Sequence, residues 1–345
     1  MRKLTILKQR AKLAAMLLTG AILLTWAASM LAPEPLTQWV FSGDSPLVSH
    51  PVPTPPVDVV GTDDVIFAPP AQFMPSARPE LQPLSAEYIE TLQCFTYLTR
   101  NIFLADSETI LLPSDIDVNR FLATDLTIDN TVDGPVVLIF HTHSAEMFID
   151  SDRSDPMTGI MGTGRYLAQI LAQQHGLETL HYTGRFDITD GHSNRPGSYE
   201  RMEPVIRQIL ADNPSIQVVI DLHRDGVRDH IPAFTRYVDG IPTAQIMFFN
   251  GLSRQNRGGQ AVDIYRLPNP YQTENLNFSF RMQLAANQMY PGLARRVYLR
   301  QFRYSLHMMP LSTLVEVGNQ HNTMQQAKNA MYPLANIIAA VVLGE

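Results

Sequence analysis

The second part of the chain alternates short apolar runs with segments of helical spacing. From residue 134 onward, the run VVLIF at 136–140 is continuous and β-branched, as expected of a buried parallel strand. Further strands are predicted at 177–182, 216–222, 244–250, 296–302 and 312–318, and helices near 162–175, 199–211, 274–289 and 323–343. This alternation predicts an α/β fold, an open and mostly parallel sheet of about six strands flanked by helices, over residues 133–345.

The preceding segments have different patterns. Residues 84–132 include a stretch of helical spacing, with Tyr88, Leu92, Phe95 and Leu98 on one side, which predicts a small N-terminal subdomain. The following DSETILLPSDI segment is typical of a short hairpin or helix pair. Residues 33–83 contain 12 of the 25 prolines and predict an extended proline-rich linker.

The N-terminus has the pattern of a membrane anchor. Residues 13–32 carry no charge, and at about 1.5 Å per residue they would form roughly 30 Å of helix, enough to cross a bilayer. Five basic residues lie in segment 1–12, which holds no acid and should remain cytoplasmic. A cleaved signal peptide is the alternative, although the apolar run is long for one. Both interpretations place the remainder outside the cytoplasm, and the first predicts a single-pass membrane protein.

Charge and cysteine content exclude several classes of function. The whole chain has a net charge of −7, and the part after residue 12 carries 21 basic against 33 acidic residues, a net charge of −12. Such a body lacks the basic face that a nucleic-acid partner requires. The single cysteine, Cys94, excludes a disulfide framework and a cysteine-rich zinc site, and its apolar neighbours predict a buried core residue.

Candidate chemistry gathers where predicted strands end, which is where open α/β sheets bind ligands. The first strand leads into His141-Thr142-His143-Ser144-Ala145-Glu146, another ends at His223-Arg224-Asp225, and the last contains Glu316. Imidazole and carboxylate groups suit a catalytic Zn²⁺, which takes three protein ligands and a water. A further carboxylate beside that water can act as general base.

Each of these residues also has a simpler interpretation. A single strand-end histidine such as His223 is commonly a hydrogen-bonded loop residue, whereas His141 and His143, two apart in extended chain, should point the same way. Spacing alone does not decide which of the pair ligates and which orients a ligand or binds substrate. Glu316 interrupts an apolar run and would be costly to bury unpaired. His192 lies in a polar loop, either solvated or next to the site.

The chain resembles the stage II sporulation protein P family over residues 85–345. The similar segments are HTHSAEMF, DGHSNRPGSYER, NPSIQVVIDLHRDG, FFNGLSRQN, MYPGLARR and STLVEVGNQHNTMQQAKNAM. The resemblance implies a zinc amidase-like fold, the anchor and linker, and a peptidoglycan hydrolase. It also implies partners of the sporulation engulfment machinery, a lytic transglycosylase and a membrane protein.

The resemblance also implies roles for single residues. His141 and Glu146 match the first histidine and the acid of HTHxxE, and His223 matches the histidine of DxHRD, so these three are expected to bind zinc. Glu316 matches the catalytic glutamate of LxEVG, and His192 the loop histidine. Apart from the resemblance, His143 is expected to assist catalysis, and Arg224 and Arg195 are expected either to bind acidic groups of the substrate or to form surface ion pairs.

The expected activity is that of an N-acetylmuramoyl-L-alanine amidase. Water held by zinc would attack the amide between MurNAc and L-alanine while Glu316 moves the proton, and peptide cross-links could be cut as well. Two other classes remain open. One is a binuclear metal-dependent phosphoesterase or amidohydrolase, for which few further strand-end ligands are left; the other is an inactive wall-binding module.

Overall fold

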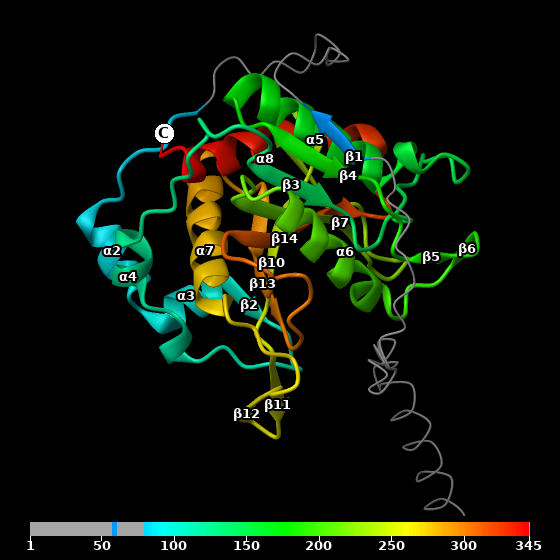
Figure 1. Ribbon diagram of the computed structural model, residues 1–345. Helices are drawn as coiled ribbons and strands as arrows, with labels where there is room; N and C mark the ends of the chain where they lie inside the picture. Colours follow the sequence, from blue (N-terminus) through cyan, green and yellow to red (C-terminus); the bar gives the residue numbers. More distant parts are fainter. Residues whose placement is uncertain (1–56, 61–78, 345) are drawn as a thin grey trace, which may run out of the picture. The chain divides into compact units, whose positions relative to one another are not determined.

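The computed structural model describes residues 57–60 and 79–344 (Figure 1). Its centre is an eight-stranded sheet in the order β1-β4-β3-β7-β14-β10-β13-β2. In that order the strands are Val57–Val60, Thr179–Tyr182, Val137–Phe140, Val218–Asp225, Ser312–Asn319, Ile246–Gly251, Ala294–Arg300 and Phe103–Ala105. Only the β1–β4 and β10–β14 pairings are antiparallel. The expectation of an α/β fold with a mostly parallel, helix-flanked sheet is confirmed, with more strands than predicted.

The two faces of the sheet are covered unequally. Side chains of β3 at Val137 and Ile139 join the larger core with helices α5 (Ile160–His175), α7 (Gln272–Met289) and α8 (Met324–Val342). The alternating side chains Leu138 and Phe140 join a smaller core with helix α6 (Ser198–Asp212). The first is called the three-helix face and the second the α6 face.

Local sequence explains where the longer helices begin and end. Helix α5 ends at Gly176, whose φ of +65° is the left-handed conformation that glycine adopts most readily. Helix α8 begins after Thr323, which accepts a hydrogen bond from the Gln326 N–H, while the Gln326 side chain accepts from the Thr323 N–H. This reciprocal capping matches the start predicted near residue 323.

The segment before β3 differs in detail from its prediction. Two short helices, α2 (Ala86–Leu92) and α3 (Phe95–Asn101), replace one continuous helix, and β2 then extends the main sheet beside β13. The DSETILLPSDI region forms a 3₁₀ turn, η2 (Pro113–Asp115), followed by helix α4 (Val118–Ala123). Cys94 lies at the break between α2 and α3 and is exposed. Its predicted burial is wrong, because the break turns it away from the apolar side.

Two features concern the predicted linker and anchor. Val57–Val60, within the proline-rich segment, pairs antiparallel with β4, as its β-branched sequence VDVV allows. The expected anchor at residues 13–32 lies outside the described residues and stays a prediction. Among the residues that the structure does describe, no helix has the length and apolar character to cross a membrane.

Three small hairpins leave the main sheet. They are β5–β6 (Ile188–Thr189 with His192–Ser193), β8–β9 (Thr235–Val238 with Ile241–Ala244) and β11–β12 (Arg254–Arg257 with Gln260–Asp263). Hairpins β5–β6 and β11–β12 project from the body in Figure 1. The first of these connects β4 to α6 and therefore borders the α6 face.

Candidate active site

Two parallel strands place three ionisable side chains at one end of the α6 face. Asp221 and His223 are two residues apart on β7, so their side chains share a face. Glu316 on β14 is directly in register with His223. Leu314, two residues earlier, packs in a small cluster separate from the three-helix core, whereas Val315 and Val317 join that core. Glu316 therefore shares the α6 face with His223.

The loop after β3 is held against this strand end by two buried aspartates. Asp221 accepts hydrogen bonds from the Thr142 N–H at 2.9 Å and from its hydroxyl at 2.7 Å. Asp187 accepts from the Ser144 hydroxyl at 2.6 Å and from the Ala145 N–H at 3.0 Å. These bonds end the strand at Phe140 and turn the chain, so that residues 142–144 are buried instead of forming a mobile loop.

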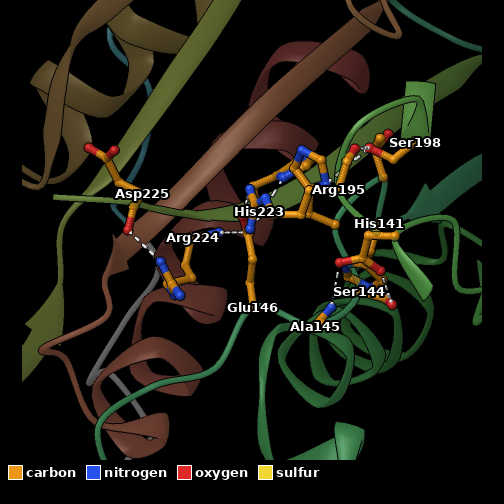
Figure 2. A network of polar contacts seen from close by, with 12 residues as sticks. His141, Ser144, Ala145, Glu146, Arg195, Ser198, His223, Arg224 and Asp225 are labelled. Carbon is orange, nitrogen blue, oxygen red and sulfur yellow. Dashed lines mark hydrogen bonds and ion pairs between the residues drawn. The ribbon is translucent and has the colours of Figure 1, made fainter. Parts of the chain in front are cut away.

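This turn brings His143 and Glu146 to His223. The rings of His143 and His223 meet edge to face with centroids 5.2 Å apart. Glu146 Oε2 lies 3.4 Å from His223 Nδ1, and Figure 2 shows the two side chains facing each other. All three side chains are nearly inaccessible to solvent. The site cluster is defined here as His143, Glu146, His223 and Glu316.

The cluster is strongly charged. His223 Nε2 lies 2.6 Å from Asp221 Oδ1 and must carry a proton, because a carboxylate only accepts. Burial disfavours a charged ring, but Asp221 and Glu146 outweigh it and hold the pKa of His223 well above its usual value. Burial likewise opposes ionisation of Glu146, yet His223 and Arg195 hold its pKa below the usual range. Burial, aided by the charge of His223, lowers the pKa of His143 to about 3.

Glu316 is the exception in this network. Its Oε2 is buried and has no hydrogen-bond partner among the described residues. Burial raises the pKa of Glu316 to about 8, and the charge of His223 only partly offsets this. Buried acceptors without partners are rare and costly in folded proteins. A buried carboxyl group with a raised pKa and a vacant oxygen is typical of a group that exchanges protons.

Both arginines predicted to bind substrate instead contact Glu146. Arg195 Nη2 donates to Glu146 Oε1 at 2.9 Å, and the backbone N–H of Arg224 donates to Oε2 at 2.9 Å. The Arg224 guanidinium is held by the carbonyl oxygens of Met147 and Asp225. These contacts orient the Glu146 carboxylate (Figure 2).

His141 does not join the site cluster, contrary to the expected pairing with Glu146 and His223. Its Nδ1 lies 2.7 Å from the Leu222 carbonyl oxygen and its Nε2 lies 2.9 Å from His181 Nε2, both on the three-helix face. The expectation that His141 and His143 point the same way is wrong, because the strand ends at Phe140 and the chain turns between them. Gly164 of α5 leaves room for the His141 ring, because a Cβ at this position would lie 2.5 Å from His141 Cε1.

The remaining predicted residue, His192, lies outside the cluster. It is exposed at the start of β6, and its Nδ1 contacts the nearby Asp190 carbonyl oxygen at 2.8 Å. Three residues that the prediction missed take part in the site: Asp221, Asp187 and Tyr199, whose ring centroid lies 5.6 Å from that of His143. Asp221 carried a signal, an acid inside the apolar run of β7, whereas the other two carried none.

The donor set suits zinc. Two ligand atoms bound tetrahedrally at about 2.0–2.1 Å lie roughly 3.3–3.4 Å from each other, and Glu146 Oε2 and His223 Nδ1 are 3.4 Å apart. Asp221 holds the other nitrogen of His223, as carboxylates commonly do for zinc-bound histidines. Among the described residues, no group of three or more His, Cys, Asp or Glu side chains is placed so that it could hold a metal ion.

The fold and the cluster define a class: an α/β protein with a buried, charged polar site at the carboxyl ends of its parallel strands, where such sheets bind their ligands. Residues 101–339 match the family model of stage II sporulation protein P (SpoIIP). The chain belongs to this family, which confirms the resemblance seen in its sequence.

A curated relative has the same family name. The stage II sporulation protein P of Bacillus subtilis (strain 168) is 23% identical over 223 residues, which cover 61% of this chain and 51% of that protein. The chain thus matches about half the length of this curated relative.

Several similar solved structures are amidases. AmiC2 of Nostoc punctiforme has 16% identity and a TM-score of 0.34, with 62% of this chain and 98% of that one covered. An amidase of Clostridium difficile 630 has 15% identity and a TM-score of 0.36, with 62% and 97% covered. The CwlD amidase of Clostridioides difficile, solved with the GerS lipoprotein, has 13% identity and a TM-score of 0.33, with 59% and 95% covered.

Proposed function

We propose that this chain is a zinc-dependent peptidoglycan hydrolase that cleaves the amide between MurNAc and L-alanine. The observation that carries the proposal is the site cluster, in which two imidazoles and two carboxylates from three separate segments meet in a buried position. Membership of the SpoIIP family supports a peptidoglycan substrate and a role in sporulation.

His143, Glu146 and His223 would hold the metal, with His143 in the place first expected for His141. A bound Zn²⁺ would supply a Lewis acid at the scissile carbonyl and lower the pKa of a water. Asp221 and Arg195 prepare the ligands, since the first fixes the proton on His223 Nε2 and the second orients the Glu146 carboxylate. Such supporting contacts commonly change metal affinity by about 10–100-fold.

Glu316 would move the proton of the reaction at its vacant Oε2. As a carboxylate it takes a proton from the attacking water, and as the acid it delivers that proton to the leaving amine. The raised pKa of Glu316 suits both halves, because an acid that ionises near neutral pH can accept and release a proton readily. Tyr199, at the start of α6, packs edge to face against His143.

The place of action follows from the same proposal. A peptidoglycan substrate requires the catalytic domain on the outer side of the membrane, which the basic segment 1–12 and the apolar segment 13–32 would provide. The engulfment partners, a lytic transglycosylase and a membrane protein, enter by family resemblance alone.

Mass analysis of muropeptides tests the proposed reaction. Purified sacculi are incubated with the full chain, with and without a chelator, and the released fragments are weighed. The proposal expects free stem peptides and peptide-free glycan, both abolished by the chelator. Release of cut cross-links alone would show an endopeptidase, and chelator-resistant binding without release would show a wall-binding module. Two zinc ions per chain would favour the binuclear alternative.

A further inference from the structure

A cavity of about 400 Å³ is bordered by α6 and by two loops, residues 268–271 and 303–308. Its apolar wall comes from Pro268, Pro270 and Met308, and its polar wall from Arg207, Arg303 and His307. No acidic side chain is among the described residues that line it.

One carboxylate behind the wall fixes the three basic groups. Glu203 Oε1 accepts from Arg207 Nε at 3.0 Å and from its Nη2 at 2.9 Å, and Glu203 Oε2 accepts from Arg303 Nη2 at 2.8 Å. His307 Nε2 lies 2.9 Å from Glu203 Oε1. Burial alone would raise the pKa of Glu203, but His307, Arg303 and Arg207 lower it to about 2.

The wall keeps an excess of positive charge. His307 Nδ1 lies 3.1 Å from the Tyr304 carbonyl oxygen, and its Nε2 faces Glu203. The two guanidinium groups of Arg207 and Arg303 face the single carboxylate of Glu203, which leaves one positive charge in excess. His307 is only 4% exposed and the side chain of Arg303 is 19% exposed, whereas the side chain of Arg207 is 48% exposed, so the cavity has a buried basic side and an open one. In a chain of net charge −7, such a cavity selects anions.

Two aromatic rings, those of Tyr199 and Tyr304, lie between the cavity and the site cluster. Tyr199 precedes Glu203 by one helical turn on α6, about 6 Å along the axis. The Tyr199 ring meets the His143 ring on one side, with centroids 5.6 Å apart, and the Tyr304 ring on the other, at 5.4 Å. A substrate reacting at the site cluster can therefore reach the cavity with a segment of a few residues.

We propose that this cavity is a subsite for a free carboxylate of the stem peptide, a short anionic peptide, on the leaving side of the scissile amide. The inference rests on the proposed function for the identity of the substrate. The arginines hold the carboxylate with hydrogen bonds assisted by charge, and the proline and methionine wall packs against the aliphatic part of the same residue. The subsite thus selects substrates by their stem peptide and takes no part in the chemical step.

Two variants test the subsite, Arg207→Gln and Arg303→Gln, alone and combined, with Arg257→Gln as the control. Arg257 lies on the β11–β12 hairpin, and its guanidinium donates to Gln255 Oε1. Binding of the free stem peptide to the full chain is measured by calorimetry, which requires no hydrolysis. Steady-state kinetics on a soluble muropeptide is measured separately, with the peptide carboxylates either free or amidated.

The proposal expects the double variant to bind the free stem peptide at least about tenfold more weakly. For the muropeptide with free carboxylates the variant raises KM with kcat unchanged, and for the amidated form wild type and variant have equal KM. Arg257→Gln changes neither. Equal peptide binding in wild type and double variant would overturn the subsite, as would inorganic phosphate displacing the peptide at equal concentration. A chain that binds the peptide through these arginines but hydrolyses nothing would overturn the proposed reaction and leave the subsite standing.

Discussion

The two histidines of the HTH motif, His141 and His143, lie on opposite faces of the sheet and have opposite electrostatic surroundings. On the three-helix face, His141 donates from Nδ1 to the Leu222 carbonyl, so its Nε2 accepts from His181. Burial lowers the pKa of His141 to about 4 and holds the pKa of His181 well below its usual value, so the pair is neutral. On the α6 face, His143 lies among His223, Glu146 and Glu316, where charge is concentrated and one carboxylate oxygen has no partner.

The difference shows what makes a buried polar group functional. Three helices close over the His141–His181 pair, in which the two neutral rings contact each other and His141 contacts the Leu222 carbonyl oxygen of β7, while His181 Nδ1 has no hydrogen-bond partner among the described residues. On the other face the small core is built with α6, and Glu316 is left with a raised pKa and an oxygen without a hydrogen-bond partner among the described residues. The neutral pair contacts β7 on the three-helix face, at the carbonyl oxygen of Leu222, one residue before His223. The charged cluster on the α6 face is the part proposed to bind a metal and a substrate.

The largest expected effect belongs to the charged face. Glu316→Gln should reduce stem-peptide release from sacculi by about 10²–10⁴-fold, the usual contribution of a general acid–base group. Zinc content and thermal stability should stay as in wild type or rise, because a neutral amide of the same shape replaces a carboxyl that is costly to ionise. Activity is followed by peptide release and zinc by elemental analysis. Retained hydrolysis in this variant would remove Glu316 from the chemistry.

Two alanine variants, one on each face, compare the effects of the two histidines on zinc affinity and on stability. His143→Ala should lower zinc affinity by more than the roughly 10–100-fold seen for supporting residues, with a modest change in stability. His141→Ala should bind zinc more nearly as wild type does but lose about 2–4 kcal/mol of stability, because it leaves a cavity and two buried polar groups without partners. Zinc competition and chemical denaturation measure the two effects. The reverse pattern would return the ligand role to His141.

Asp221 links the two faces, since it holds both His223 and the turn that separates the histidines. Asp221→Asn should weaken zinc binding by about 10–100-fold, because the amide no longer fixes the proton on His223 Nε2. The chelator concentration that removes half of the zinc is the measurement. An unchanged value would mean that the contact is only structural.

Gly164 tests the packing of the closed face. A methyl group there would approach His141 Cε1 to 2.5 Å and His181 Nε2 to 3.0 Å. Gly164→Ala should therefore cost about 1–3 kcal/mol by overpacking, with zinc affinity of the folded fraction close to wild type. Gly176→Ala at the end of α5 is a control that strains the backbone without touching the histidines. A loss of zinc binding as large as that of His143→Ala would erase the distinction between the faces.

The smallest effect concerns pH. Since burial lowers the pKa of His141 to about 4, the folded state binds fewer protons than the unfolded chain between that value and the ordinary one. The stabilisation is therefore fully present above about pH 6.5 and is lost as the pH falls toward 4, by about 1–2 kcal/mol between pH 7 and 5. Denaturation in EDTA should show this slope in wild type and a shallower one in His141→Asn. Equal slopes would show that the His141 ring is not held neutral.

The sequence predicted the strands and the residue types of the site, but not its geometry. The strand runs and Glu316 were readable because a buried strand must be apolar, so that an acid within it stands out. The divergence of His141 and His143 was not readable, because it depends on Asp187 and Asp221, which reach the turn from more than forty residues away. The burial of Cys94 was predicted wrongly and the edge strands β1 and β2 were not predicted for the same reason. A break between helices and an edge pairing are set by tertiary contacts.

The most direct test of the central claim is the position of the metal. Crystals of the full chain grown with zinc would be measured at the zinc absorption edge, and the anomalous difference map would locate each bound ion. We predict one anomalous peak within bonding distance of His143, Glu146 and His223, next to Glu316 and away from His141. A peak between His141 and His181, or no peak at the site cluster in a chain that carries stoichiometric zinc, would contradict it.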